Sequence, residues 1–180
     1  MKILKCGIVL FIIATVAAVS LSVVEKVTRP SIEEQKYLAT QSALKVVMPE
    51  ASSYEEIKDL DFTGTTITNV YEGVGVGYVV AVNPKGYGGA VEMLVGFDGE
   101  YKVTGIDIVS HSETPGLGAK ADEDEFKNQY VGKTPELTVV KTSTTGEDEI
   151  SAITSSTITS TAVTVGVNEA YSFLLEMEGK

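Results

Sequence analysis

The chain has 180 residues, enough for one domain and an attached segment. Its 25 acidic and 14 basic residues give a formal net charge of −11 at pH 7, which excludes a role on nucleic acid. With one cysteine and one histidine, the chain offers no disulfide framework, no cysteine-rich iron–sulfur site and no histidine-based metal centre.

The first predicted element is a membrane-spanning helix over residues 6–24, where 19 residues (CGIVLFIIATVAAVSLSVV) carry no charge. At ~1.5 Å per residue this stretch is about 29 Å long, close to the ~30 Å hydrocarbon core of a bilayer. A cleaved signal peptide is the alternative, because Lys2 and Lys5 form a positive N-terminal region. We favour a retained anchor, because no small-x-small cleavage site stands ahead of polar sequence.

The charges that flank this helix predict its orientation. Lys2 and Lys5 lie on the short N-terminal side, so residues 1–5 are expected in the cytoplasm and residues 25–180 on the far side of the cytoplasmic (inner) membrane. Without these two lysines, 12 basic residues stand against 25 acidic ones, a net charge near −13 for the exported part. Cys6 precedes the apolar run, so we expect an anchor residue and not a lipid-carrying cysteine.

A stalk is predicted between the membrane helix and the domain, over residues 25–50. Arg29-Pro30 is expected to end or kink the first helix, and Ser31-Ile-Glu-Glu34 has the capping-box pattern of a new one. The domain is expected over residues 51–180, with a second short helix from Ser53.

The middle of the chain, rich in Val, Ile, Tyr and Gly, predicts a sheet. Turn signals at Gly73, at residues 83–86 and at residues 98–99 are close together, which favours antiparallel hairpins. The expected strands cover residues 66–72, 75–83, 88–97 and 101–109. Beyond them we expect an acidic helix over 121–130, a strand over 137–142 and an amphipathic C-terminal helix. The fold class is therefore α+β, an antiparallel sheet with flanking helices.

One candidate binding segment is Ile153–Val163 (ITSSTITSTAV), in which seven of eleven residues are Ser or Thr. A helix start needs one capping hydroxyl. The surplus hydroxyls and the free N–H groups of the first turn are suited to a phosphate. The alternative is a Ser/Thr-rich cap with no ligand.

Two further segments could approach a flat ligand. In His111-Ser-Glu-Thr-Pro-Gly-Leu-Gly118, the tight turn lets the backbone come close, and Glu113 and Thr114 could bond the polar edge of a heterocycle. In Lys85-Gly-Tyr-Gly-Gly89, Tyr87 could stack on a planar ligand, although the spacing is not that of a P-loop. A plain surface turn is the alternative for each. No nucleophile accompanies His111 and Glu113, so no catalytic residue is assigned.

In this order, before a terminal helix, the three motifs resemble those of the FMN-binding G subunits of Rnf electron-transport complexes (RnfG), relatives of the C subunit of the sodium-pumping NADH:quinone reductase (NqrC). The resemblance covers essentially the whole chain. It implies FMN bound covalently through its phosphate to a threonine, the last residue of the motif D-x-x-(S/T)-G-A-T.

Two registers of that motif remain open. Aligned through the downstream helix, the acceptor is Thr157, with Thr154, Ser155 and Ser156 in the (S/T)-G-A places and Ser151 in place of the Asp. The rival register begins at Asp148 and makes Thr154 the acceptor. We favour Thr157, because the helix fixes the place of the cofactor.

The resemblance also implies a function, an electron-carrying subunit of a membrane-bound, ion-translocating ferredoxin:NAD⁺ oxidoreductase. The expected partners are the other Rnf subunits, especially the membrane-embedded D subunit, and a flavin transferase during maturation. The alternatives are a free-standing membrane-anchored FMN reductase and a cofactor-free anchored scaffold or pilus-like protein. The expected cofactor-binding residues are Tyr87, His111, Glu113, Thr114, Pro115, Gly116, Leu117, Gly118, Thr154, Ser155, Ser156, Thr157 and Thr159.

Overall fold

The computed structural model describes residues 2–142 and 146–179, with side chains from Cys6 onward. The chain divides into two compact units with a boundary between Ala39 and Thr40. The first unit consists of helix α1 (Lys2–Val47) up to that boundary. An 18-residue window of α1 has a mean hydropathy of 2.6, so the helix is long and apolar enough to cross a membrane.

Helix α1 is continuous through Pro30. Of the two outcomes predicted at Arg29-Pro30, an end of the membrane helix with a new helix from Ser31 is therefore wrong, and a kink stays a prediction. A proline inside a helix removes one backbone hydrogen bond, and good helix formers stand on both sides of this one. Arg29 also donates from Nε to Glu33 at 3.1 Å, an i,i+4 pair that spans the proline.

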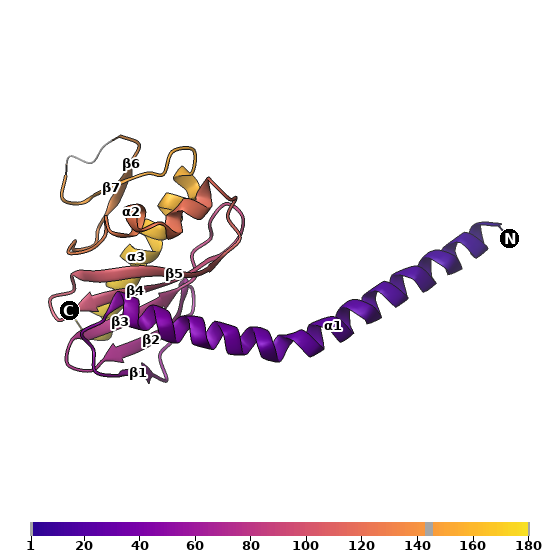
Figure 1. The fold of residues 1–180 in the computed structure, drawn as a ribbon, viewed down its shortest axis with the longest axis horizontal. Coiled ribbons are helices and arrows are strands. Elements are labelled where there is room, and N and C mark those ends of the chain that lie inside the picture. The colour runs from indigo at the N-terminus through magenta and orange to yellow at the C-terminus, as the bar shows by residue number, and fades with distance from the viewer. Residues whose placement is uncertain (1, 143–145, 180) are drawn as a thin grey trace. The chain divides into compact units, whose positions relative to one another are not determined.

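The domain, residues 40–180, is built on a five-stranded antiparallel sheet whose strands follow one another in chain order (Figure 1). The hairpins arise where the glycine and Asn-Pro turns were expected, so the four predicted strands are confirmed within a few residues. The strands are β1 (Tyr54–Ile57), β2 (Ile67–Gly73), β3 (Gly77–Val82), β4 (Val91–Asp98) and β5 (Val103–His111).

The helix expected from Ser53 is wrong, because Tyr54–Ile57 forms edge strand β1 and pairs with β2. The pairing outweighs a weak capping pattern, since Tyr and Ile suit a half-buried strand. The Tyr54 hydroxyl also donates to the Met48 carbonyl at 2.7 Å, which ties the start of this strand to the end of α1.

Short elements and one long helix complete the domain. The acidic segment expected to be one helix forms two short ones, and the last predicted strand is confirmed over three residues. It pairs in parallel with a strand that the sequence did not predict. The elements are the 3₁₀ helix η1 (Gly118–Asp122), α2 (Asp124–Lys127), β6 (Thr138–Val140), β7 (Glu149–Ser151) and α3 (Thr157–Met177).

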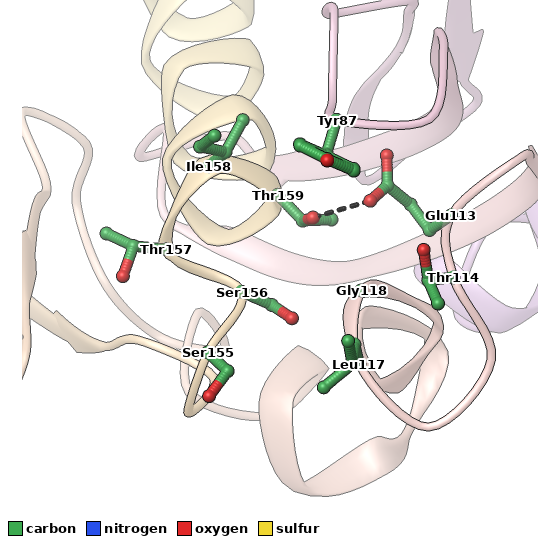
Figure 2. A pocket seen from close by; sticks show the side chains of 10 residues that line it. All are labelled: Tyr87, Glu113, Thr114, Leu117, Gly118, Ser155, Ser156, Thr157, Ile158 and Thr159. Carbon is green, nitrogen blue, oxygen red and sulfur yellow. Dashed lines mark hydrogen bonds between the residues drawn. The ribbon is translucent and has the colours of Figure 1, made fainter.

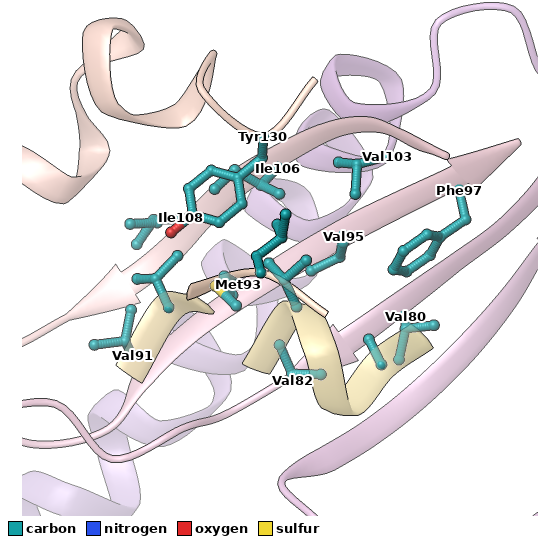
Figure 3. Packing of buried hydrophobic residues seen from close by; sticks show 14 of the residues in the cluster. Val80, Val82, Val91, Met93, Val95, Phe97, Val103, Ile106, Ile108 and Tyr130 are labelled. Carbon is teal, nitrogen blue, oxygen red and sulfur yellow. The ribbon is translucent and has the colours of Figure 1, made fainter. Parts of the chain in front are cut away.

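The main core lies between one face of the sheet and helix α3 (Figure 3). Alternate residues of β3 and β4 point into it, including Val80, Val82, Met93 and Val95, as the two-residue period of a strand requires. Tyr130 is fully buried there, and its hydroxyl shares a 2.7 Å hydrogen bond with Thr164 of α3. Burial raises the pKa of the Tyr130 phenol, so it stays neutral.

The opposite face of the sheet receives the last turn of α1. Leu44, Val47 and Met48 are buried against Val79 and Leu94. The approach is close because Gly96 of β4 and Gly105 of β5 are cross-strand partners beneath Val47. Thr104 donates its hydroxyl to the Val47 carbonyl at 2.6 Å, which satisfies one of the free carbonyls of the helix end.

We expect Gly96→Ala to lower the free energy of unfolding by about 1–3 kcal/mol, the usual cost of overpacking. A Cβ atom at Gly96 would lie 2.7 Å from the Val47 carbonyl oxygen and would overlap the Thr104 hydroxyl. Urea unfolding of the full-length chain in detergent, followed by tyrosine fluorescence, measures the change. Gly99→Ala is the control, because its Cβ would lie 3.8 Å from the nearest atom. Equal stability of the two variants would contradict this packing.

Candidate functional site

The three sequence motifs converge on one hollow of about 550 Å³ at the N-terminal end of α3 (Figure 2). Its volume is typical of a small-molecule site, about 300–1,000 Å³. Each motif contributes: the turn before β4, the segment after β5, and the Ser/Thr cluster. The lining residues are Tyr87, Glu113, Thr114, Leu117, Gly118, Ser155, Ser156, Thr157, Ile158 and Thr159.

Glu113 joins the three motifs. The residue is 6% exposed, and both carboxylate oxygens accept hydrogen bonds from other motifs. Oε1 accepts from the Gly88 N–H at 3.0 Å, and Oε2 accepts from the Thr159 hydroxyl at 2.7 Å (Figure 2). A buried carboxylate needs such partners, so this pair of bonds fixes the two loops against the first turn of α3.

Glycines leave the space that this carboxylate fills. A Cβ atom at Gly86 would overlap Glu113 Oε1, and one at Gly118 would overlap Oε2 and lie 2.8 Å from the Thr159 hydroxyl oxygen. Sequence reasoning expected Gly118 to let the backbone approach a ligand. In the structure, its missing side chain also makes room for Glu113.

The Ser/Thr cluster separates into hydroxyls that hold the fold and hydroxyls of residues that line the hollow. Ser160 accepts from the Ile153 N–H at 3.0 Å and donates to the Ser156 carbonyl at 3.1 Å. The side chains of Ser155, Ser156 and Thr157 make no hydrogen bond within the described residues, and Ser156 does not cap the helix with its hydroxyl. The first turn of α3 therefore offers uncapped N–H groups beside three hydroxyls that remain available to a ligand.

Ser155 has a left-handed backbone, with φ of +64°. This conformation costs an L-residue roughly 1–2 kcal/mol and costs glycine almost nothing. Ser155 is exposed, so packing imposes little on its side chain. The left-handed turn reverses the chain just before Thr157, so that α3 begins beside the hollow.

We expect Ser155→Gly to raise the free energy of unfolding by about 0.5–1 kcal/mol, because relief of the left-handed strain exceeds the entropy that glycine adds to the unfolded chain. Ser155→Val should lower it by about 1 kcal/mol, since a β-branched side chain tolerates this conformation least. Thermal melts followed by circular dichroism compare the three proteins. A glycine variant less stable than the valine variant would refute this reading of the turn.

The remaining sequence-predicted residues lie outside the hollow. His111 ends β5, and its Nδ1 accepts from the Glu113 N–H at 3.2 Å, which shapes the loop. Pro115 and Gly116 form a turn closed by the Leu117 N–H on the Thr114 carbonyl at 3.1 Å. Thr154 lines a separate hollow with Lys120, Phe126 and Gln129. The structure thus brings together nine of the predicted residues and leaves these four apart.

Ile158 was missed by sequence reasoning. It lines the hollow and is 56% exposed, and the exposed Tyr87 and Leu117 line the same hollow. The sequence feature that could have indicated Ile158 is an apolar residue among hydroxyls in the first turn of a predicted helix. Together these side chains add exposed apolar and aromatic surface to a lining that also carries hydroxyls and a carboxylate.

Comparison with known proteins identifies the family. Residues 86–172 match the family described as "FMN-binding domain", and residues 1–47 match "RnfG N-terminal region". The G subunit of the Na⁺-translocating ferredoxin:NAD⁺ oxidoreductase complex of Acetobacterium woodii is 41% identical, with 91% of this chain and 87% of that protein covered. The chain belongs to the RnfG family.

Other RnfG relatives match over similar lengths. The G subunit of the proton-translocating ferredoxin:NAD⁺ oxidoreductase complex of Clostridium ljungdahlii is 36% identical, with 86% of this chain and 82% of that protein covered. The G subunit of the ion-translocating oxidoreductase complex of Methanosarcina acetivorans is 31% identical, with 99% of this chain and 97% of that protein covered. The predicted resemblance to RnfG is confirmed.

Solved structures confirm the α+β fold of this RnfG chain. The C subunit of a Na⁺-translocating NADH-quinone reductase from Parabacteroides distasonis superposes with a TM-score of 0.59 at 20% identity, with 81% of this chain and 94% of that chain covered. NqrC from Shewanella oneidensis gives 0.55 at 14% identity, with 76% and 88% covered. At these identities the likeness concerns the fold.

Proposed function

We propose that this chain is the electron-carrying G subunit of a membrane-bound, ion-translocating ferredoxin:NAD⁺ oxidoreductase, and that it carries FMN as a phosphoester on Thr157. The relatives' names support the complex, and the FMN-binding family match supports the cofactor. The observation that carries the site is the hollow at the start of α3, where three free hydroxyls and uncapped N–H groups lie beside exposed apolar and aromatic side chains.

The residues of the hollow fit a flavin nucleotide. The hydroxyls of Ser155 and Ser156 and the first N–H groups of α3 can donate to phosphate oxygens, and the helix dipole favours the negative charge. Tyr87, Leu117 and Ile158 offer apolar contact to a planar ring. When bound, FMN supplies the electron-transfer chemistry, and these side chains hold and orient it.

The backbone at Ser155 favours Thr157 over Thr154 as the acceptor. In the Thr157 register Ser155 takes the glycine place of the motif, and it has the positive φ that glycine adopts readily. In the Asp148-led register that place falls on Ala152, whose φ is not positive. Thr154 also faces the hollow of Lys120 and Gln129, away from Tyr87 and Glu113.

The test is the full-length chain purified from membranes of a host that also expresses a flavin transferase. We expect a yellow protein whose flavin stays with the polypeptide after acid denaturation, and which co-purifies with the other subunits, including a membrane-embedded D subunit. A colourless folded protein would support the cofactor-free scaffold, and release of the flavin by acid would exclude the ester. Covalent flavin without partner subunits would favour the free-standing reductase.

We also propose the topology. Residues 1–5 face the cytoplasm, residues 6–24 span the inner membrane, residues 25–50 form the stalk, and residues 51–180 lie outside. Two lysines on the short flank support this orientation. The helical conformation of α1 through residues 6–24 supports the span, because its backbone groups are satisfied internally.

A cysteine at Glu100 reports the side of the membrane. The Glu100 side chain is 77% exposed in the turn after β4, so Glu100→Cys, in a Cys6→Ser background, should react with an impermeant maleimide added to intact cells. Asp98 is a poorer position, because its carboxylate accepts from the N–H groups of Glu100 and Lys102. Labelling only after lysis would reverse the topology.

A further inference from the structure

A second hollow adjoins the first on the other side of the helix start. Its volume is about 370 Å³, and Thr157 and Ile158 line both hollows. In Figure 2 the Thr157 side chain points away from Glu113 and Thr159. The other residues of the second hollow are Thr66, Pro84, Lys85, Thr161, Ala162 and Val165.

Lys85 is the charged residue of this second hollow, and its backbone is well fixed. It forms a β-bridge with Ala90, and the Gly86 N–H donates to the Gly89 carbonyl at 2.7 Å. The same loop is held to Glu113 through the Gly88 N–H. Within the described residues the Lys85 ammonium has neither an ion-pair nor a hydrogen-bond partner, so its charge is available to a ligand.

The net negative charge of the domain makes a cation near the start of α3 important for binding an anion there. Residues 25–180 hold 12 basic and 25 acidic residues, a net charge near −13, so an anion at the start of α3 enters a repulsive field. Across the two hollows the charged side chains are Glu113 and Lys85. Glu113 is an anion that already accepts two hydrogen bonds. Lys85 is the cationic side chain that lines a hollow together with Thr157.

We propose that Lys85 is the counter-charge for the phosphate esterified to Thr157. The inference rests on the proposed flavin ester. The phosphate lies between the first turn of α3 and the Lys85 ammonium, and the rest of the nucleotide extends past Ile158 into the larger hollow. Lys85 is thus a positioning residue, which favours both the phosphodiester and the negative charge that develops as the ester forms.

Attachment of the flavin to Thr157 is a transfer of a phosphoryl group. The Thr157 Oγ–P bond forms, and the bond from the same phosphorus to its leaving group breaks. The donor is a flavin dinucleotide, so AMP departs, and the hydroxyl proton passes to a base of the transferase. No electron changes hands, so the rate reports charge and geometry at the acceptor.

The experiment compares initial rates of flavin attachment by intact-mass analysis, with full-length protein in detergent, a flavin transferase and a flavin dinucleotide. We expect Lys85→Gln to react about tenfold more slowly, less than the ~100-fold or greater loss of a fully buried donor because Lys85 is exposed. Lys85→Arg should restore the rate to within about twofold, since it keeps the charge. Added salt should slow the wild type more than Lys85→Gln.

Lys58→Gln is the matched control, because Lys58 is also exposed and follows β1, away from both hollows. Circular dichroism verifies that each variant is folded. If Lys85→Gln reacts at the wild-type rate, or if Lys58→Gln slows attachment equally, Lys85 is not the counter-charge. If the wild type acquires no flavin on Thr157, the proposed function itself fails, and this inference fails with it.

Discussion

We expect Thr157→Val to abolish the proposed covalent attachment of flavin and to leave the domain folded. Valine keeps the β-branched shape at the first residue of α3 but lacks the hydroxyl oxygen that the proposed ester requires. The Thr157 hydroxyl makes no hydrogen bond within the described residues, so its loss should change the free energy of unfolding by less than about 0.5 kcal/mol. Flavin absorbance in the acid-precipitated polypeptide measures the first effect, and circular dichroism measures the second.

The matched control is Thr154→Val, three residues earlier in the same Ser/Thr cluster. Thr154 is exposed and faces a different hollow, so this variant should keep its covalent flavin. The opposite pattern, with flavin retained in Thr157→Val and lost in Thr154→Val, would show that the motif begins at Asp148.

We expect Glu113→Ala to lower the free energy of unfolding by about 3 kcal/mol. The change leaves the buried Thr159 hydroxyl and the part-buried Gly88 N–H without their acceptor, and each orphaned group costs about 1–3 kcal/mol. Flavin attachment should also fall, because the Lys85–Gly89 loop is no longer held to α3. Urea unfolding and intact-mass analysis of the same preparation measure both effects.

Glu113→Gln separates the hydrogen bonds from the charge. The amide oxygen can still accept from the Gly88 N–H, and the amide nitrogen can donate to Thr159 Oγ. The loss of stability should therefore stay below about 1.5 kcal/mol, the size of one ordinary hydrogen bond. If the alanine variant is as stable as the glutamine variant, Glu113 does not hold the three motifs together.

The sequence predicted the parts of the fold that depend on local pattern. Strands β2 to β5 follow from a stretch rich in Val, Ile, Tyr and Gly with closely spaced turns, and α3 follows from a helical repeat after Ser160. Each of these signals lies within a few residues of the feature that it predicts.

Features that depend on long-range contacts escaped prediction. Tyr54–Ile57 is a strand because β2 offers it an edge, and β7 exists because β6 lies beside it. Pro30 leaves α1 intact although the local rule favours a break. Neither the pairing partners nor the tolerance of a single missing hydrogen bond can be read from neighbouring residues.

In the site, too, local motifs predicted some features, and long-range contacts determine the others. The motifs indicated which segments meet, and nine of the expected residues line one hollow. The sequence could not assign Glu113 to Gly88 and Thr159, because those bonds join residues 25 and 46 positions apart. Nor could it assign the left-handed backbone to Ser155, since serine occupies a place where glycine is the usual signal.

The most direct test of the flavin ester is fragmentation of the modified peptide from the wild-type chain. Cleavage after Glu149 and Glu169 releases residues 150–169, which contain both Thr154 and Thr157. Fragments that include Thr157 but begin after Thr154 should carry the mass of the flavin phosphate, and fragments that end at Ser156 should not. A flavin mass on Thr154, or an unmodified peptide from a yellow protein, would contradict the assignment of the cofactor to Thr157.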